Sequence, residues 1–184
     1  MEEVSTIGLD IAKSVFQAHG ADAAGRQLFS QRIARAKVLP FFARQPRCLV
    51  AMEACGRSHH WAREIARLGH EVRLIPPVYV KPFVKRQKND AADAEAICEA
   101  ARRPNMRFVA TKSEEQQASG LVFRTRDLLV RQRTQTINGI RGHLAEYGWV
   151  APRGPRWVSM LGEMAEDELG ASLPSAARDM VVSG

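Results

Sequence analysis

The sequence predicts an α/β domain with a mixed five-stranded sheet and flanking helices, followed by one long helix. Three observations support this fold class. The chain starts with three short apolar segments joined by brief turns, and two further strand patterns then alternate with helical patterns. Finally, the stretch from Ser113 to Tyr147 contains no proline, and its apolar residues recur at helical spacing.

The first three strands are expected over residues 4–12, 14–21 and 26–33. The turn from Ala23 to Gly25 separates the second from the third. Consecutive strands with such short connections form an antiparallel meander.

After the meander, helical patterns alternate with strand patterns. A helical pattern over residues 37–44 precedes a strand at 48–53, and a helix at 58–68 precedes a strand at 71–76. Gly69 is suited to end that second helix. Strand-helix-strand connections place neighbouring strands parallel, so the sheet is expected to be mixed, with helices on both faces.

The two prolines Pro76 and Pro77 break the chain before a basic stretch. Asn89 or Asp90 is suited to cap a further helix that runs to about Arg103. The helix over residues 113–147 would be about 50 Å long at 1.5 Å per residue. A linker from residue 148 to 155 and a short acidic helix over 157–169 are expected to follow.

Composition limits the class of protein. Lys and Arg number 27 against 20 Asp and Glu, a formal net charge of +7, which favours polyanionic partners or is ordinary solubility charge. The three cysteines lack metal-ligand spacing and suggest reduced thiols in the cytoplasm. No apolar run has the length of a membrane span or of a signal peptide, so a membrane partner is not expected.

An acid lies in the first strand, where the sequence TIGLDIAK places Asp10 among apolar residues. A carboxylate taken out of water needs a partner, and nothing local to Asp10 supplies one. Asp10 shares a strand face with the small residues Gly8 and Ala12, which leave room around it.

Three further acids are candidates to join Asp10. Glu53 ends the fourth strand, and carboxyl ends of strands are where ligand sites gather in such sheets. Asp90 and Asp93 lie three residues apart, on one face of the expected helix. Each has a structural alternative: Asp90 as an N-cap, Asp93 as a partner of the helix dipole, and Glu53 as a partner of Arg57.

Four carboxylates without cysteine or paired histidine suit a hard divalent cation, Mg²⁺ or Mn²⁺, rather than zinc. Such ions would neutralise acids that otherwise repel one another. In-line displacement at phosphorus uses two such ions, so we interpret the set as a nuclease-like phosphodiester site.

Basic residues lie where a phosphodiester backbone is expected, close in sequence to Asp90 and along the long helix. A solvated helix face is the alternative for those on the long helix. Tyr79 and Phe83 are candidates to stack on a base or else pack in the protein. The predicted nucleic-acid contacts are Lys81, Lys85, Arg86, Lys88, Arg124, Arg131 and Arg133.

Taken in order, four stretches resemble the DEDD transposases of bacterial insertion sequences, a group that includes pilin-gene invertases. They are IGLDIAKSVFQAHG, VAMEACGRSHHWAR, VKPFVKRQKNDAADAEAICEA and SEEQQASGLVFRTRDLLVRQRTQTINGIRGHLAEYG, within residues 5–180. The resemblance implies that Asp10, Glu53, Asp90 and Asp93 are the catalytic, metal-binding tetrad.

The same resemblance implies a RuvC-like, RNase H-like catalytic domain over residues 1–110 and a dimerisation coiled coil over 111–148. Residues 149–184 would form a linker and the start of a C-terminal domain with a nucleophilic serine, which this chain is expected to lack. The implied function is metal-dependent cleavage and strand transfer of insertion-sequence DNA. A structured guide RNA and a second copy of the chain, bound through residues 113–147, are the other implied partners.

Two other functions remain open from the sequence. The chain could be a non-catalytic nucleic-acid-binding and dimerisation module, held together by residues 113–147. It could also be an actin-like or sugar-kinase-like nucleotide binder, since those proteins carry a G-x-D pattern in their first strand. The nucleotide binder needs a second glycine-rich phosphate loop, and none is evident in the sequence.

Overall fold

The computed structural model describes residues 3–84, 89–150 and 172–183. The chain divides into two compact units, residues 1–114 and residues 115–184. In the described ranges, no helix combines the length and the apolar character that a membrane crossing requires.

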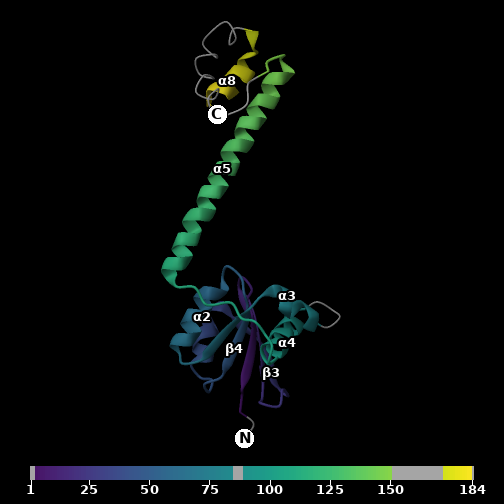
Figure 1. The fold of residues 1–184 in the computed structure, drawn as a ribbon, viewed down its shortest axis with the longest axis vertical. Helices are drawn as coiled ribbons and strands as arrows, with labels where there is room; N and C mark the ends of the chain where they lie inside the picture. The colour runs from purple at the N-terminus through teal and green to yellow at the C-terminus, as the bar shows by residue number, and fades with distance from the viewer. Residues whose placement is uncertain (1–2, 85–88, 151–171, 184) are drawn as a thin grey trace. The chain divides into compact units, whose positions relative to one another are not determined.

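The first unit is built on a mixed five-stranded sheet in the order β3-β2-β1-β4-β5 (Figure 1). Strand β2 pairs antiparallel with β1 and β3, whereas β1, β4 and β5 run parallel. This confirms the meander and the mixed sheet, the architecture expected of an RNase H-like domain. The strands are β1 (Thr6–Asp10), β2 (Val15–Ala21), β3 (Gln27–Ala34), β4 (Leu49–Glu53) and β5 (Glu71–Ile75).

Helices cover both faces of this sheet, as expected from the strand-helix connections, with α2 and α4 on opposite sides (Figure 1). One segment differs from expectation, because Pro76 and Pro77 do not simply break the chain. Pro77 opens a short helix, since proline at the first helical position loses no hydrogen bond. The helical segments are η1 (Arg35–Lys37), α1 (Val38–Phe42), α2 (Ser58–Arg67), α3 (Pro77–Val80), η2 (Lys81–Phe83) and α4 (Asp90–Ala101).

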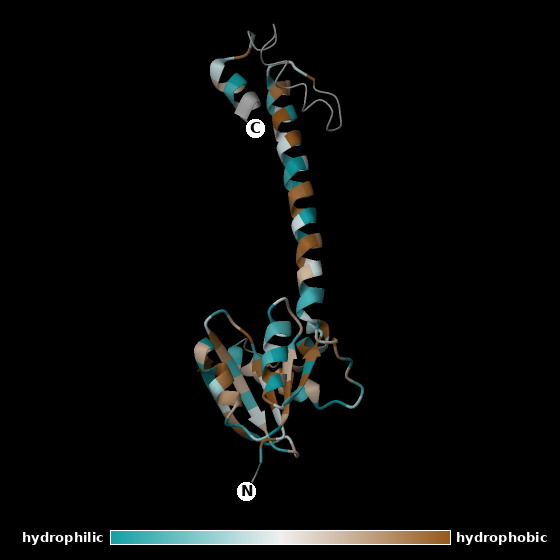
Figure 2. Ribbon diagram, turned by 90° about the vertical axis from the view of Figure 1, so that its left-hand side faces the viewer, coloured by the Kyte–Doolittle hydropathy of each residue, from teal (hydrophilic) through white to brown (hydrophobic). Residues whose placement is uncertain are grey.

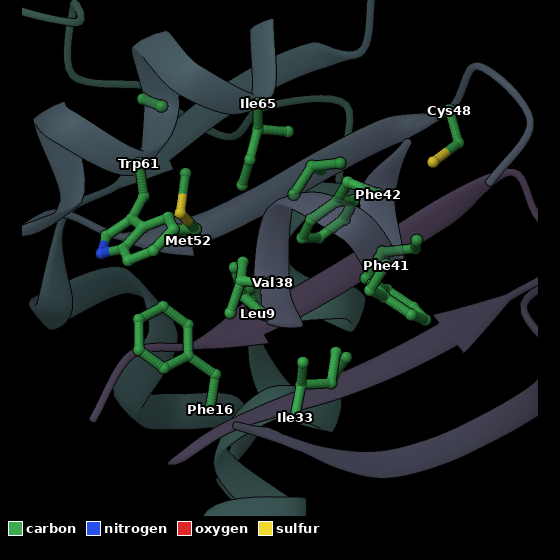
Figure 3. Packing of buried hydrophobic residues seen from close by; sticks show 14 of the residues in the cluster. Leu9, Phe16, Ile33, Val38, Phe41, Phe42, Cys48, Met52, Trp61 and Ile65 are labelled. Atoms are coloured by element: carbon green, nitrogen blue, oxygen red, sulfur yellow. The ribbon is translucent and has the colours of Figure 1, made fainter. Parts of the chain in front are cut away.

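The larger core lies between the sheet and the helices α1 and α2 (Figure 3). Ile7 and Leu9 reach it from β1, because alternate side chains of a strand share a face. Phe16 and Trp61 meet edge to face there, with ring centroids 4.9 Å apart.

The opposite face of the sheet is covered by α4. Ala51 and Ile75 of the sheet pack in a second cluster with Ile97 and Ala100 of α4. The small residues of α4 allow a close approach to β1, because a Cβ placed on Gly8 would lie 2.2 Å from the carbonyl oxygen of Ala94. Gly8 and Asp10 are two residues apart on β1, so they share the face that α4 covers.

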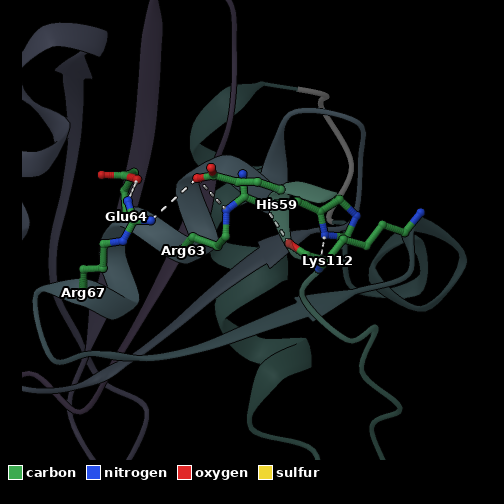
Figure 4. Close-up of polar contacts among 6 residues, drawn as sticks. His59, Arg63, Glu64, Arg67 and Lys112 are labelled. Carbon is green, nitrogen blue, oxygen red and sulfur yellow. Dashed lines mark hydrogen bonds and ion pairs between the residues drawn. The ribbon is translucent and has the colours of Figure 1, made fainter. Parts of the chain in front are cut away.

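The segment that leads to the long helix forms hydrogen bonds with β5 and with α2, and those with α2 are drawn in Figure 4. The amide of Val109 donates to the carbonyl oxygen of Leu74 at 2.8 Å. The amide of Lys112 donates to His59 Nδ1 at 3.2 Å, and Arg63 Nη1 donates to the Lys112 carbonyl oxygen at 2.7 Å. The pKa of His59 is lowered, first by burial and then by the charges of Lys112 and Arg63. The lowered pKa favours the neutral imidazole, which accepts the hydrogen bond from the Lys112 amide.

The long helix is α5 (Glu114–Glu146), close to the bounds expected from the sequence. In the second unit, Ile140 and Leu144 of this helix are buried, as is Leu173. The tail expected at the end of the chain contains the helix α8 (Ser175–Ser183). The helix expected over 157–169 and most of the linker before it lie outside the described residues.

Candidate active site

Asp10 is the last residue of β1 and is half-buried. Its strand neighbours Leu9 and Gly8 are buried, so the carboxylate lies where the buried strand reaches the surface of the sheet. The amide of Ile11 donates a hydrogen bond to this carboxylate. The structure therefore leaves Asp10 only partly solvated.

Glu53 lies on the neighbouring parallel strand at the matching position. The register pairs Leu9 of β1 with Met52 of β4, and Asp10 and Glu53 are the residues that follow. Val50 and Met52 lie in the large core, so Glu53 shares the opposite face with Ala51. Both strand acids therefore lie on the side of the sheet that α4 covers.

The first turn of α4 supplies the other two acids. The side chain of Asn89 accepts a hydrogen bond from the amide of Ala92 at 2.8 Å, so Asn89 is the N-cap. Asp90 is therefore not used as a cap. Asp90 is exposed and Asp93 is half-buried. Asp90 lies one turn before Ala94, which contacts Gly8, and Asp93 directly precedes Ala94.

The electrostatics show that these four acids lie close enough to interact. The pKa of Asp10 is raised from 3.8 to about 6, first by burial and then by the charges of Asp93, Asp90 and Glu53. The pKa of Glu53 is also raised, first by burial and then by Asp93. Residues distant along the chain thus form one acidic cluster.

Among the residues that the structure describes, no basic side chain is paired with Asp10 or Glu53 of this acidic cluster. In the same ranges, Arg57 is exposed without pairing to Glu53. In the described part of the chain, no three acidic, histidine or cysteine side chains are close enough together to hold an ion as they stand. A bound cation would reduce the repulsion between these carboxylates. The donor set still fits a hard divalent cation, because it offers only carboxylate oxygens.

The predicted nucleic-acid contacts fall in three places. Lys81 is exposed in η2, near the start of the basic stretch. Lys85, Arg86 and Lys88 lie outside the described residues. The three arginines of α5 are exposed, and two of them donate to carbonyl oxygens of their own helix; the three are Arg124, Arg131 and Arg133.

Sequence analysis missed a pocket beside α4. It is lined by residues of α3, η2 and the segment after α4, and its volume is about 370 Å³. Proline at the first helical position was the signal for α3, but nothing in the sequence indicated that the segment 105–107 returns to it. The lining residues are Tyr79, Pro82, Phe83, Asn105, Met106 and Arg107.

Residues 7–148 match a family model described as a transposase, the DEDD transposase of the IS110 group. A protein of Pseudomonas aeruginosa named as a probable family 20 transposase is 55% identical over 157 residues, which are 85% of this chain and 46% of that protein. The transposase for insertion sequence element IS1328 of Yersinia enterocolitica is 44% identical over 167 residues, covering 91% of this chain and 50% of that protein. The chain spans about half the length of these curated relatives.

One solved structure, Thermus thermophilus RuvC in complex with a Holliday junction substrate, also aligns with the chain. Its TM-score is 0.41 at 16% sequence identity, over 56% of this chain and 98% of the other.

Proposed function

This chain belongs to the DEDD transposase family, and from that membership we propose that residues 1–114 form the metal-dependent, nuclease-type catalytic domain of a DNA transposase. The observation that carries this proposal is the acidic cluster. Three other carboxylates act on Asp10, and within the described ranges no basic side chain offsets them. A protein retains such a cluster at a cost in stability, which a bound cation offsets.

Asp10, Glu53, Asp90 and Asp93 would hold the divalent cations, Mg²⁺ or Mn²⁺. When bound, such ions supply activation of the nucleophile and stabilisation of the leaving oxygen at a phosphodiester. The protein supplies the placement of the carboxylates. Asp10 and Glu53 are fixed by paired strands, and Asp90 and Asp93 by a helix that packs directly on β1.

The DNA strand would be held by basic side chains through its phosphates, without sequence readout. Lys81 is available for this beside α4, and Lys85, Arg86 and Lys88 follow it in the sequence. Arg124, Arg131 and Arg133 offer a second set on α5. A structured guide RNA is a further proposed partner, since the same contacts bind any phosphodiester backbone. We place the protein in the cytoplasm, where its DNA substrate is found.

Strand transfer is proposed as an activity of a longer protein that includes a second domain with a nucleophilic serine. Residues 1–114 would contribute the carboxylate site to that reaction. The proposal for this chain is therefore limited to cation binding and to phosphodiester chemistry at the carboxylates.

Calorimetric titration of the 184-residue chain with Mn²⁺ and with Mg²⁺ tests the proposal directly. Asp10→Asn is expected to lower the affinity at least ten-fold, because it removes a ligand charge from the centre of the cluster. Glu99→Gln, on the same helix but paired with Arg103, is the matched control and should leave the affinity unchanged. Equal cation affinity in the wild type and in a folded Asp10→Asn variant would refute the catalytic proposal.

A second function is favoured by a separate observation. α5 exposes large apolar side chains along its length, visible as hydrophobic bands in Figure 2. Phe123, Val130 and Ile137 follow one another at intervals of seven, the repeat of a coiled coil. The chain would then act as a nucleic-acid-binding and dimerisation module, with α5 pairing with the same helix of a second copy.

A further inference from the structure

We propose that the pocket lined by Tyr79, Phe83 and Arg107 binds one unpaired base of a nucleic-acid strand held by this unit. This inference rests on the proposed function, because it assumes that the unit binds nucleic acid. It adds a site for a base to contacts that otherwise reach only phosphates. The pocket, of about 370 Å³, falls within the range of roughly 300–1,000 Å³ that is typical of small-molecule sites.

The floor of the pocket is apolar and anchored. Phe83 and Met106 are half-buried and pack against the cluster that includes Ile97 and Ala100 of α4. Arg103 lies over the ring of Phe83, 5.2 Å from its centroid, and is itself paired with Glu99. These contacts fix Phe83 as part of the wall.

Tyr79 is the free aromatic ring of the pocket. Its side chain is 40% exposed, and among the described residues no other ring and no cation stacks on it. The comparable exposed ring of Phe108 differs, because Arg73 already lies over it at 4.8 Å. Bases of any sequence stack on such a ring, since every base has a π-face.

The polar groups around the pocket match the edge and the charge of a nucleotide. Asn105 and Arg107 are exposed, and neither forms a hydrogen bond or ion pair with another described residue. An amide and a guanidinium are the groups that hydrogen-bond base edges most often. The lining contains no carboxylate and includes the guanidinium of Arg107, so its charge suits an anionic strand. A second pocket along α4 differs, because Glu95 and Glu99 face it together with Arg102 and Arg103.

The position of the pocket relates it to the acidic cluster. Phe83 is contacted by Arg103, just beyond the end of α4, while Asp93 lies in the first turn of the same helix. From Asp93 to the last residue of α4, Ala101, the helix rises about 12 Å at 1.5 Å per residue. The pocket and the acidic cluster therefore lie toward opposite ends of α4, so one bound strand would reach both.

Fluorescence anisotropy of the 184-residue chain with a labelled single-stranded oligodeoxynucleotide tests this site. Tyr79→Ala is expected to weaken binding roughly ten-fold, the size of one lost base stack. Tyr79→Phe should keep nearly full affinity, because it retains the ring. Phe108→Ala, which removes an exposed ring outside the pocket, should bind like the wild type.

Two further arms separate a base pocket from a backbone contact. A matched duplex should bind Tyr79→Ala and the wild type equally, since its bases are stacked and paired. An abasic substitution moved along the oligonucleotide should weaken wild-type binding at one position, and Tyr79→Ala should abolish that dependence. The same series in RNA shows which kind of strand fills the pocket.

The outcomes distinguish this proposal from the one on which it rests. Binding of single strands that is the same in the wild type and in Tyr79→Ala, with no sensitive abasic position, overturns the pocket and leaves the catalytic proposal intact. Absence of binding to any single strand or duplex overturns nucleic-acid binding by this unit, and with it the pocket.

Discussion

Gly8 of β1 lies directly under Ala94 of α4, so closely that a Cβ on Gly8 would be 2.2 Å from the Ala94 carbonyl oxygen and 2.6 Å from the amide nitrogen of Cys98. A backbone oxygen in a helix cannot move aside as a flexible side chain can. The contact therefore sets how near the first turn of α4 comes to Asp10. It couples a core glycine to the geometry of the acidic cluster.

Gly8→Ala is expected to destabilise the protein by about 1–3 kcal/mol, because the added methyl group overpacks a helix-strand contact. It should also weaken Mn²⁺ binding, since α4 carries Asp90 and Asp93 away from β1. Denaturant unfolding and calorimetry measure the two effects. Gly56→Ala is the control: a Cβ on Gly56 has no neighbour within 4 Å, so both quantities should stay near the wild type. Unchanged stability of Gly8→Ala would contradict the close contact.

The raised pKa of Asp10 predicts an unusual pH dependence of stability. The folded protein holds the Asp10 proton up to about pH 6, whereas the unfolded chain releases it near 3.8. Between these values the folded state binds more protons, so this group makes stability fall as the pH rises. Above pH 6 the charged Asp10 lowers the free energy of unfolding by about 1 kcal/mol, after allowance for solvent screening of a half-exposed group.

Asp10→Asn should therefore raise the melting temperature of the cation-free protein at pH 7–8 and lose this advantage below about pH 4. Thermal denaturation across that pH range is the measurement. Added Mn²⁺ should stabilise the wild type and not the variant. A variant less stable than the wild type at pH 8 without cation would show that Asp10 is paired rather than repelled.

Asn89 caps α4 and so positions the two helix acids. Asn89→Ala removes the hydrogen bond to the Ala92 amide and is expected to cost about 1 kcal/mol. Asn89→Asp keeps an oxygen that can accept this bond and should retain most of the stability. Chemical denaturation compares the three proteins. If Asn89→Ala and Asn89→Asp lost stability equally, the cap would not be the cause.

The exposed apolar side of α5 predicts a dimer. Phe123→Asp combined with Val130→Asp is expected to give a monomer by light scattering, because charge replaces two of the most regularly spaced apolar residues. Helix content should persist, since Phe123 is 68% and Val130 39% exposed. Gln135→Asp adds a charge away from that side and should leave the mass unchanged. A double variant with the wild-type mass would exclude pairing through this side of α5.

Local patterns were enough to predict most of the fold. Short strand-like segments with brief connections, the turn at Gly25 and the stop at Gly69 are properties of neighbouring residues. Both glycines have the positive φ that such positions favour. The helix α3 was missed because Pro77 was interpreted as a break. The helix α8 was missed because a short segment near the chain end carries a weak periodic signal.

The pocket beside α4 could not be predicted in the same way. It depends on how residues 105–107 return to α3 and η2 after α4 ends, which is a matter of long-range packing. Tyr79 and Phe83 were recognised as aromatic residues in a basic stretch. That Phe83 forms a wall under Arg103, while the ring of Tyr79 stays free, is visible only once α4 is packed in place.

The sequence by itself determined which acids are present and which elements carry them: Asp10 within the first strand, Glu53 at the end of the fourth, and Asp90 and Asp93 in a helical first turn. The tertiary structure ended the first strand at Asp10. The tertiary structure decided that β1 and β4 are adjacent and parallel, that α4 packs on the face of Gly8, and that Asn89 rather than Asp90 is the cap. The physical reason is the distance along the chain over which each effect acts. Propensity and periodicity act between neighbouring residues, whereas the field that raises the pKa of Asp10 depends on burial and on charges that only the packed sheet and helix bring near.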